Sequence, residues 1–135
     1  MVVPKGNITP VQYEILQVIW GGNDEGSTVA EIWREISKSR SVGRTTVLNL
    51  VDRLEKRGWL TRRQAPGGYR YRTTLNREET THTLAAEFVD DFFDGKASDL
   101  VMSLLGNRSI KKSEVERLRK LIDKASQKSK RRKEK

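Results

Sequence analysis

Residues 43–57 constrain the fold of this chain more than any other segment, because their apolar and polar side chains alternate with the period of an α-helix. The apolar positions have the spacing of one buried helix face: Val47, Leu50, Val51 and Leu54. Thr46, Asn49 and Arg53 form the other face, which is short and rich in hydrogen-bond donors. Gly58 supplies a left-handed stop. Such a helix needs other elements to cover its apolar face, and it offers its polar face to a partner.

Two shorter helices are predicted before this one. Thr9 stands three residues before Gln12, as in a capping box, and the helix that follows has apolar residues at helical spacing: Val11, Ile15, Val18 and Ile19. Thr28 and Glu31 form a second possible capping box. The helix after Thr28 turns three residues inward: Ile32, Trp33 and Ile36. Three amphipathic helices in succession can therefore cover one another.

A β-hairpin is predicted after the third helix. Residues 59–65 and 69–75 are rich in aromatic and β-branched side chains, and Pro66-Gly67-Gly68 joins them. Four arginines lie on this hairpin: Arg62, Arg63, Arg70 and Arg72. The order helix, helix, helix, hairpin is that of a winged helix-turn-helix. We therefore expect a mainly α fold with a small β-hairpin wing.

The basic charge lies in the same part of the chain. The 135 residues carry a net charge of +9, and residues 34–72 alone carry eleven basic and three acidic side chains. A reader of the DNA major groove needs a polar, donor-rich helix face with basic flanks. We expect Thr46 and Asn49 to contact base edges and the arginines to contact phosphates. The predicted contacts with double-stranded DNA are Arg44, Thr45, Thr46, Asn49, Arg53, Arg62, Arg63, Arg70 and Arg72.

Three further amphipathic helices are predicted between residues 76 and 125. Their apolar stripes have little to pack against in one chain, so a second copy is the natural cover. The predicted two-fold interface consists of Leu84, Phe88, Phe92, Leu100, Leu104, Leu118 and Ile122. We expect a DNA-binding domain over 1–75, a dimerisation region over 76–125 and a disordered basic tail over 126–135. The tail either solubilises the chain or contacts nucleic acid without sequence preference.

Several function classes are excluded or disfavoured. The chain has no cysteine and one histidine, His82, so thiolate, disulfide and His-rich metal sites are excluded. The acidic group on the fourth helix is interpreted as a solvated face: Glu87, Asp90, Asp91 and Asp94. We therefore expect no enzyme, no metal and no cofactor. The +8 charge of residues 34–72 argues against a winged helix used only for protein contacts, and no small-molecule pocket is evident.

Three segments together resemble the penicillinase-repressor family of bacterial regulators, the BlaI/MecI group. They are Tyr13-Glu14-Ile15-Leu16 with Ile19-Trp20, then Thr45-Thr46-Val47 with Arg53-Leu54 and Arg57-Gly58, then a short wing ending at Tyr71. The resemblance covers residues 8–122. It implies a homodimeric transcriptional repressor whose winged helix binds half of a palindromic operator and whose C-terminal helices dimerise.

The resemblance also implies a signalling route. Family members are often encoded beside a membrane metalloprotease sensor, and cleavage in the C-terminal domain by the sensor or a downstream protease ends repression. The matching position here is Ser103-Leu104, where staphylococcal members have Asn-Phe. The alternative is a winged-helix regulator controlled by a different signal or partner protein. No segment approaches the roughly 20 apolar residues of a membrane span, so we expect a cytoplasmic protein.

Overall fold

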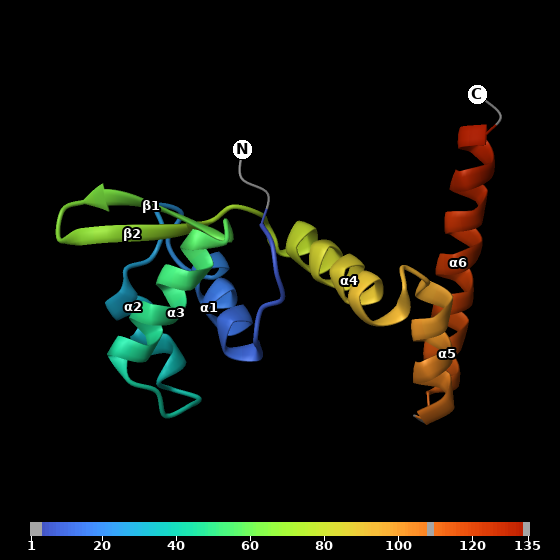
Figure 1. Ribbon diagram of the computed structural model, residues 1–135, viewed down its shortest axis with the longest axis horizontal. Helices are drawn as coiled ribbons and strands as arrows, with labels where there is room; N and C mark the ends of the chain where they lie inside the picture. Colours follow the sequence, from blue (N-terminus) through green and yellow to red (C-terminus); the bar gives the residue numbers. More distant parts are fainter. Residues whose placement is uncertain (1–3, 108–109, 134–135) are drawn as a thin grey trace. The chain divides into compact units, whose positions relative to one another are not determined.

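The computed structural model describes the backbone of residues 4–107 and 110–133 (Figure 1). The chain divides into two compact units, residues 1–95 and 96–135. The first unit contains six elements: α1 (Pro10–Trp20), α2 (Val29–Ile36), α3 (Arg44–Lys56), β1 (Leu60–Ala65), β2 (Gly68–Thr73) and α4 (Arg77–Phe93). The predicted order of three helices and a hairpin is confirmed.

Local sequence signals place the helix starts. Thr9 accepts a hydrogen bond from the backbone of Gln12, and the Gln12 side chain accepts one in return from the backbone N–H of Thr9. The same reciprocal pairs cap α2 and α4, at Thr28 with Glu31 and at Asn76 with Glu79. Each pair satisfies two backbone N–H groups that a helix start would otherwise leave without a partner.

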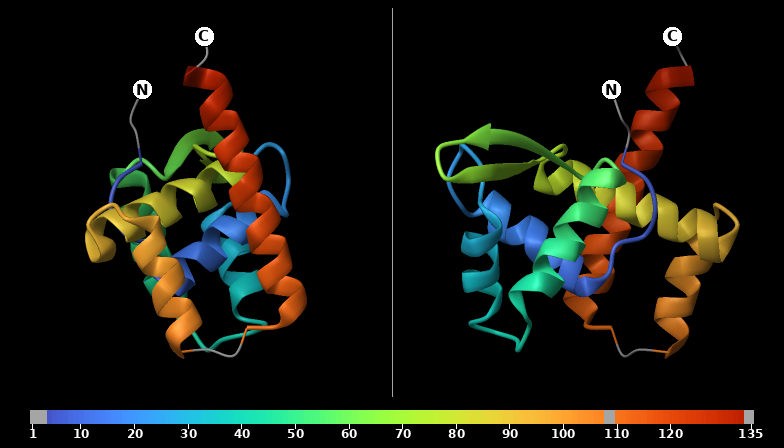
Figure 2. Two further views of the ribbon diagram at one scale, coloured as in Figure 1. Left: turned by 90° about the vertical axis from the view of Figure 1, so that its right-hand side faces the viewer. Right: turned by 60° about the vertical axis from the view of Figure 1, so that its left-hand side comes forward.

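The core of the first unit lies between α1, α2 and α3 and extends under the hairpin, which projects beyond the helices (Figure 2). It consists of Ile15, Leu16, Ile19, Ile32, Ile36, Val47, Val51, Leu54, Trp59, Leu60 and Tyr71. Burying a side chain of this size contributes about 1.5–3 kcal/mol relative to exposing it. The core therefore fixes which face of α3 points inward.

Three indole N–H groups tie distant segments to this core. Trp33 Nε1 donates to the Val42 carbonyl at 2.9 Å and so holds the turn that precedes α3. Trp20 Nε1 donates to Thr73 Oγ1 at 3.0 Å, at the end of β2. Trp59 Nε1 donates to the carbonyl of Lys5 at 3.2 Å. Each bond joins an apolar ring in or against the core to a polar backbone or hydroxyl group at its edge.

The wing is anchored to the helices by β2. β1 and β2 pair antiparallel, and Arg62 lies opposite Tyr71. On its other side Tyr71 pairs with Ser27, whose backbone exchanges hydrogen bonds of 2.8 and 3.0 Å with it. Gly26 approaches the same strand with a φ of +103°, and a Cβ there would lie 2.7 Å from the Tyr71 carbonyl oxygen. Only glycine fits this position without strain.

The fourth helix begins as part of the first unit. Thr80 is buried and Leu84 packs against the core of its own chain, although its apolar stripe predicts a contact with a second copy. The compact unit accordingly extends to Gly95, beyond the boundary predicted after residue 75. The helix ends at Asp94, which adopts a left-handed φ of 49°.

The second unit contains α5 (Ala97–Asn107) and α6 (Lys112–Lys133). Gly106 lies inside α5, and Ser113 lies in the first turn of α6. The predicted disordered tail is helical as far as Lys133, because its Lys, Arg and Gln residues favour helix and no Gly or Pro interrupts them. Residues 134–135 of that tail lie outside the described residues. In the described part of the chain, no helix is long and apolar enough to cross a membrane.

Substitution of Gly26 should test how strongly the wing anchor limits stability. We expect Gly26→Ala to lower the free energy of unfolding by about 3 kcal/mol, because the new methyl group meets the Tyr71 carbonyl and the backbone is left-handed. Gly67→Ala shares the left-handed φ, at +90°, but meets nothing within 4 Å, so it should cost about 1 kcal/mol. Urea unfolding of both variants measures the difference. Equal losses would mean that the contact with Tyr71 does not matter.

Candidate nucleic-acid interface

The outward face of α3 is set by its three fully buried residues. Val47, Val51 and Leu54 are each 0% exposed. Since the helix turns by about 100° per residue, Thr45 and Asn49 lie opposite this buried face. Thr46 and Arg53 lie along one edge and are also exposed. All the α3 residues predicted to contact DNA are therefore exposed. The centre of the exposed face lies at Thr45 and Asn49, whereas the sequence pattern placed it at Thr46, Asn49 and Arg53.

Leu48 is a residue of this face that the sequence pattern did not single out. It is 47% exposed and lies along the edge opposite Thr46. With Arg44 it lines a hollow shared with the start of α2 and with the wing, including Tyr69, which is 45% exposed. The sequence did contain a signal for it, because Leu48 is an apolar residue that does not belong to the buried stripe of the helix. An exposed leucine here can contact a thymine methyl group.

One side of the wing turns Arg62 toward α3. Its guanidinium lies 4.4 Å from the centroid of the Tyr69 ring, and its Nε lies 3.2 Å from Glu55 Oε2. The Glu55 carboxylate raises the pKa of Arg62 above its ordinary value. These contacts connect the end of α3 to the wing and hold the Arg62 charge between them.

The other side of the wing carries Arg63, Arg70 and Arg72. Arg70 Nη1 donates to the Gly26 carbonyl at 2.9 Å and to Glu31 Oε1 at 3.0 Å. Arg63 approaches Glu25 at 3.8 Å, and Arg72 is exposed. Arg70, predicted to contact DNA, is therefore engaged inside the protein, where it ties the wing to the start of α2.

Glu31 serves both the helix cap and the wing. Its carboxylate accepts a hydrogen bond from the Thr28 backbone N–H, which is the largest cause of its lowered pKa. The Thr28 hydroxyl and the Arg70 guanidinium lower the pKa further, while partial burial opposes them. A lowered pKa in the folded state means that this carboxylate stabilises the fold at neutral pH. That contribution is lost as the pH falls below the ordinary value of 4.5.

Several basic groups of this surface keep their charge available. Among the ion pairs of the described residues, none involves Arg44, Arg53 or Arg72. Lys56 pairs with Asp52 at 3.0 Å, but both side chains are at least half exposed. Exposed pairs of this kind contribute little to stability and are easily exchanged for a phosphate. Arg44, Arg53 and Arg72 are therefore exposed charges that no ion pair of the described residues engages.

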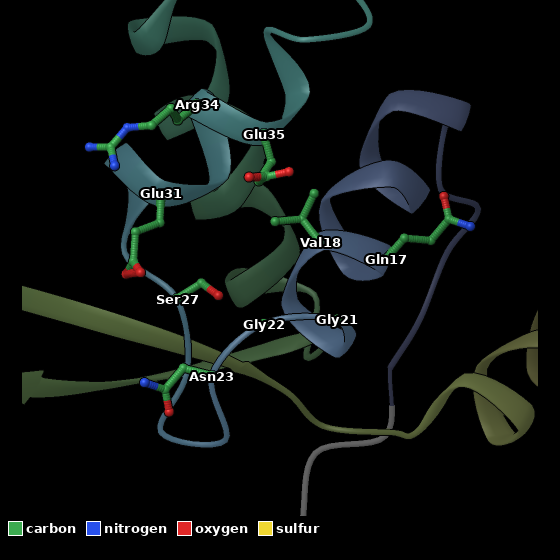
Figure 3. A pocket seen from close by; sticks show the side chains of 9 residues that line it. All are labelled: Gln17, Val18, Gly21, Gly22, Asn23, Ser27, Glu31, Arg34 and Glu35. Carbon is green, nitrogen blue, oxygen red and sulfur yellow. The ribbon is translucent and has the colours of Figure 1, made fainter.

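A second hollow lies between α1 and α2, where Figure 3 shows polar side chains from both helices and from the loop between them. Ser27 and Glu31 line it, and the Arg70 tie engages Glu31.

On α4, burial raises the pKa of Glu87, and Asp91 and Asp90 raise it further. In the described residues no group of three or more His, Asp or Glu side chains is placed to hold a metal.

The residues predicted to form a dimer interface differ in exposure. Phe88, Phe92, Leu104 and Ile122 are between 41% and 64% exposed, and Leu100 and Leu118 are half-buried. Three more large apolar residues of α5 and α6 are exposed: Met102, Leu105 and Leu121. Ser103 and Leu104, at the predicted cleavage position, are exposed within the helix α5.

Comparison with known proteins gives one family. The family model described as penicillinase repressor matches residues 8–124. The penicillinase repressor of Staphylococcus aureus is 25% identical over 121 residues, which cover 90% of this chain and 94% of the relative. The methicillin resistance regulatory protein MecI of Mammaliicoccus sciuri is 21% identical over 117 residues, or 87% of this chain and 94% of the relative.

Among solved structures, the chain is similar to the monomeric form of BlaI from Bacillus licheniformis, determined in complex with the blaP half-operator. The identity is 22% and the TM-score 0.48, over 57% of this chain and 93% of that chain.

The Arg70 tie predicts a pH-dependent loss of stability. We expect Arg70→Ala to lower the free energy of unfolding by about 1 kcal/mol at pH 7, since it removes hydrogen bonds to Glu31 and to the Gly26 carbonyl. Arg72→Ala, on the same strand and exposed, should change it by less than about 0.5 kcal/mol. As the pH falls from 4.5 through the lowered pKa of Glu31, the carboxylate becomes protonated, so the loss at Arg70 should shrink over that range to that of the Gly26 bond. Urea unfolding in a series of buffers from pH 7 downward measures both effects, and a loss that does not change with pH would contradict the tie.

Proposed function

This chain belongs to the penicillinase repressor family, and we propose that it is a homodimeric transcriptional repressor that binds palindromic operator DNA through its winged helix. The family consists of regulators rather than enzymes. The observation that carries the proposal is the donor-rich face of α3, held opposite three fully buried side chains and beside a basic wing. A protein that acts on genomic DNA works in the bacterial cytoplasm.

The geometry supports a division of roles on the DNA. Thr45, Thr46 and Asn49 face outward at the N-terminal half of α3, the part of a recognition helix that reads base edges in the major groove. Arg44 and Arg53 lie at the edges of that face and suit phosphates. From the wing we assign phosphate or minor-groove contacts to Arg62, Arg63 and Arg72, and we give Arg70 the structural role described above.

The exposed apolar residues of α4, α5 and α6 support a homodimer. Large apolar side chains are exposed on all three helices, at Phe92 (64%), Met102 (69%) and Ile122 (58%), for example. Soluble monomers rarely leave large apolar patches exposed to water. A two-fold interface covers the same residues on both copies, and each large side chain that it buries adds about 1.5–3 kcal/mol.

Proteolysis in α5 is the proposed route to release, with a membrane metalloprotease sensor or its downstream protease as the partner. A cut between Ser103 and Leu104 would separate α6 from the rest of the chain and remove three of the seven predicted interface residues: Leu104, Leu118 and Ile122. Because both residues lie inside a helix, a protease would have to unwind α5 locally before it could cleave. The dimer, once cut, would lose the linkage that lets two half-sites be bound together.

The two classes of DNA contact can be separated by mutation. Asn49→Ala should relax the preference at one or two base pairs, at a cost on the order of 1–3 kcal/mol for the preferred site. Arg53→Ala should weaken all duplexes about equally and make the salt dependence shallower by roughly one unit. Fluorescence anisotropy can measure both, with a duplex selected from a random pool and its scrambled version. An unchanged preference in Asn49→Ala would refute the groove assignment of α3.

The proposed interface makes a second prediction. In sedimentation at micromolar concentration we expect a dimer. Phe92→Glu combined with Leu104→Glu should weaken dimerisation by at least roughly 100-fold, because charges would enter the apolar contact. His82→Glu, at an exposed position of α4, is the control and should leave the dimer intact. The double variant should also bind the selected duplex far more weakly. A wild-type protein that is monomeric and still binds this duplex tightly would contradict the proposed dimer.

A further inference from the structure

One face of α6 carries a continuous row of basic side chains. Arg117, Lys120, Lys124 and Lys128 follow one another at intervals of three or four residues, so they lie along the same side of the helix. All four are exposed. Val115, Leu118 and Ile122 form an apolar stripe on the opposite side by the same periodicity. Leu121, which is 54% exposed, lies beside the row and lines the same hollow as Arg117 and Lys124. The helix therefore has two faces that can serve two partners at once.

The row is basic in excess. None of its four described side chains takes part in an ion pair. One acidic residue occurs between Arg117 and Lys128: Asp123, three residues after Lys120, lines the same hollow as Lys120 and Lys124. Residues 117–128 carry five basic side chains and one acidic, so this part of the helix keeps a net positive charge.

The positive charge continues to the end of the helix. The backbone of α6 stays helical through Lys133, and residues 129–133 add four basic residues to the sequence. Residues 124–135 carry seven basic and one acidic side chain, a net charge of +6. The family match ends at residue 124, so the resemblance does not account for this segment.

We propose that this basic face of α6 is a second DNA-binding surface, which contacts the phosphates of duplex DNA regardless of sequence. The proposal rests on the function proposed above, since the winged helix brings the chain to DNA. Duplex DNA carries one negative charge per about 1.7 Å of its axis, so a length of about 16 Å offers more phosphates than the four cations of the row can neutralise. The helix already orders the backbone that carries these cations, so no backbone entropy has to be lost to align them on binding.

Tethering favours DNA over other polyanions. The winged helix and α6 belong to one chain, so once the winged helix is bound the basic face meets DNA at an effective concentration near the millimolar range. In a dimer the face is present twice. An anionic membrane could attract the same charges, but it would have to compete with a polyanion already held by the same molecule.

The test neutralises the row in the full-length chain. The variant Lys120→Gln, Lys124→Gln, Lys128→Gln keeps good helix formers, and circular dichroism and sedimentation check its helix content and dimer. The matched control is Lys96→Gln, Lys111→Gln, Lys112→Gln, which loses the same charge at exposed positions outside the row. Both are compared with the wild type on a selected duplex and on its scrambled version, from 50 to 300 mM salt.

We expect the row variant to lose at least tenfold affinity for both duplexes at about 150 mM salt, while the ratio of the two affinities stays unchanged. The slope of log affinity against log salt should become shallower by about 0.9 for each phosphate that the variant no longer neutralises. The control should lose clearly less affinity. Equal losses of affinity in both variants would overturn the proposal, because net charge alone would then explain them. No loss of affinity in the row variant would also overturn it and would mean that these charges only keep the chain soluble.

A third outcome would assign the face to a membrane. If the wild type bound vesicles of phosphatidylserine and phosphatidylcholine, and the row variant lost that binding but kept its DNA affinity, the proposal would be wrong. Failure of the winged-helix function would look different, because the wild type would then not distinguish the selected duplex from the scrambled one.

Discussion

The backbone pairing of Ser27 with Tyr71 is the contact on which the geometry of the proposed DNA-binding surface depends. It joins β2 to the segment before α2, while the Tyr71 ring lies in the core that α3 also packs against. Tyr71 therefore connects the wing with α3, and Arg70 adds a polar tie on the far side of the strand. This arrangement requires glycine at position 26, since a larger residue would push β2 away from the helices.

Local patterns in the sequence are enough to predict most elements of the first unit. The capping boxes at Thr9 and Thr28 and the buried stripe of α3 depend on neighbours within four residues, so their spacing reveals them. The engagement of Arg70 could not be predicted in this way, because its partners Gly26 and Glu31 lie about forty residues earlier. Spacing shows which residues share a face, but it does not show which other segment that face meets.

The same limit explains the differences at the fourth helix and at the C-terminal end. Leu84 belongs to an apolar stripe, and only the tertiary packing shows that the core of its own chain covers it. The high charge of the segment after residue 125 favours disorder, yet each of its residues tolerates a helix that has already formed. The helices α5 and α6 were predicted from their apolar stripes, and the proposed cover of those stripes is a second chain rather than a segment of this one.

The three indole ties also determine what an optical probe of this protein can see. All three tryptophans, Trp20, Trp33 and Trp59, lie in the first unit, and each holds a backbone or hydroxyl partner at the edge of the core. Intrinsic tryptophan emission therefore comes from the first unit alone. A local unfolding event confined to the second unit has no indole of its own to report it. A reporter for that event has to be introduced into the second unit, where the absence of cysteine from the chain leaves a single engineered thiol free for selective labelling.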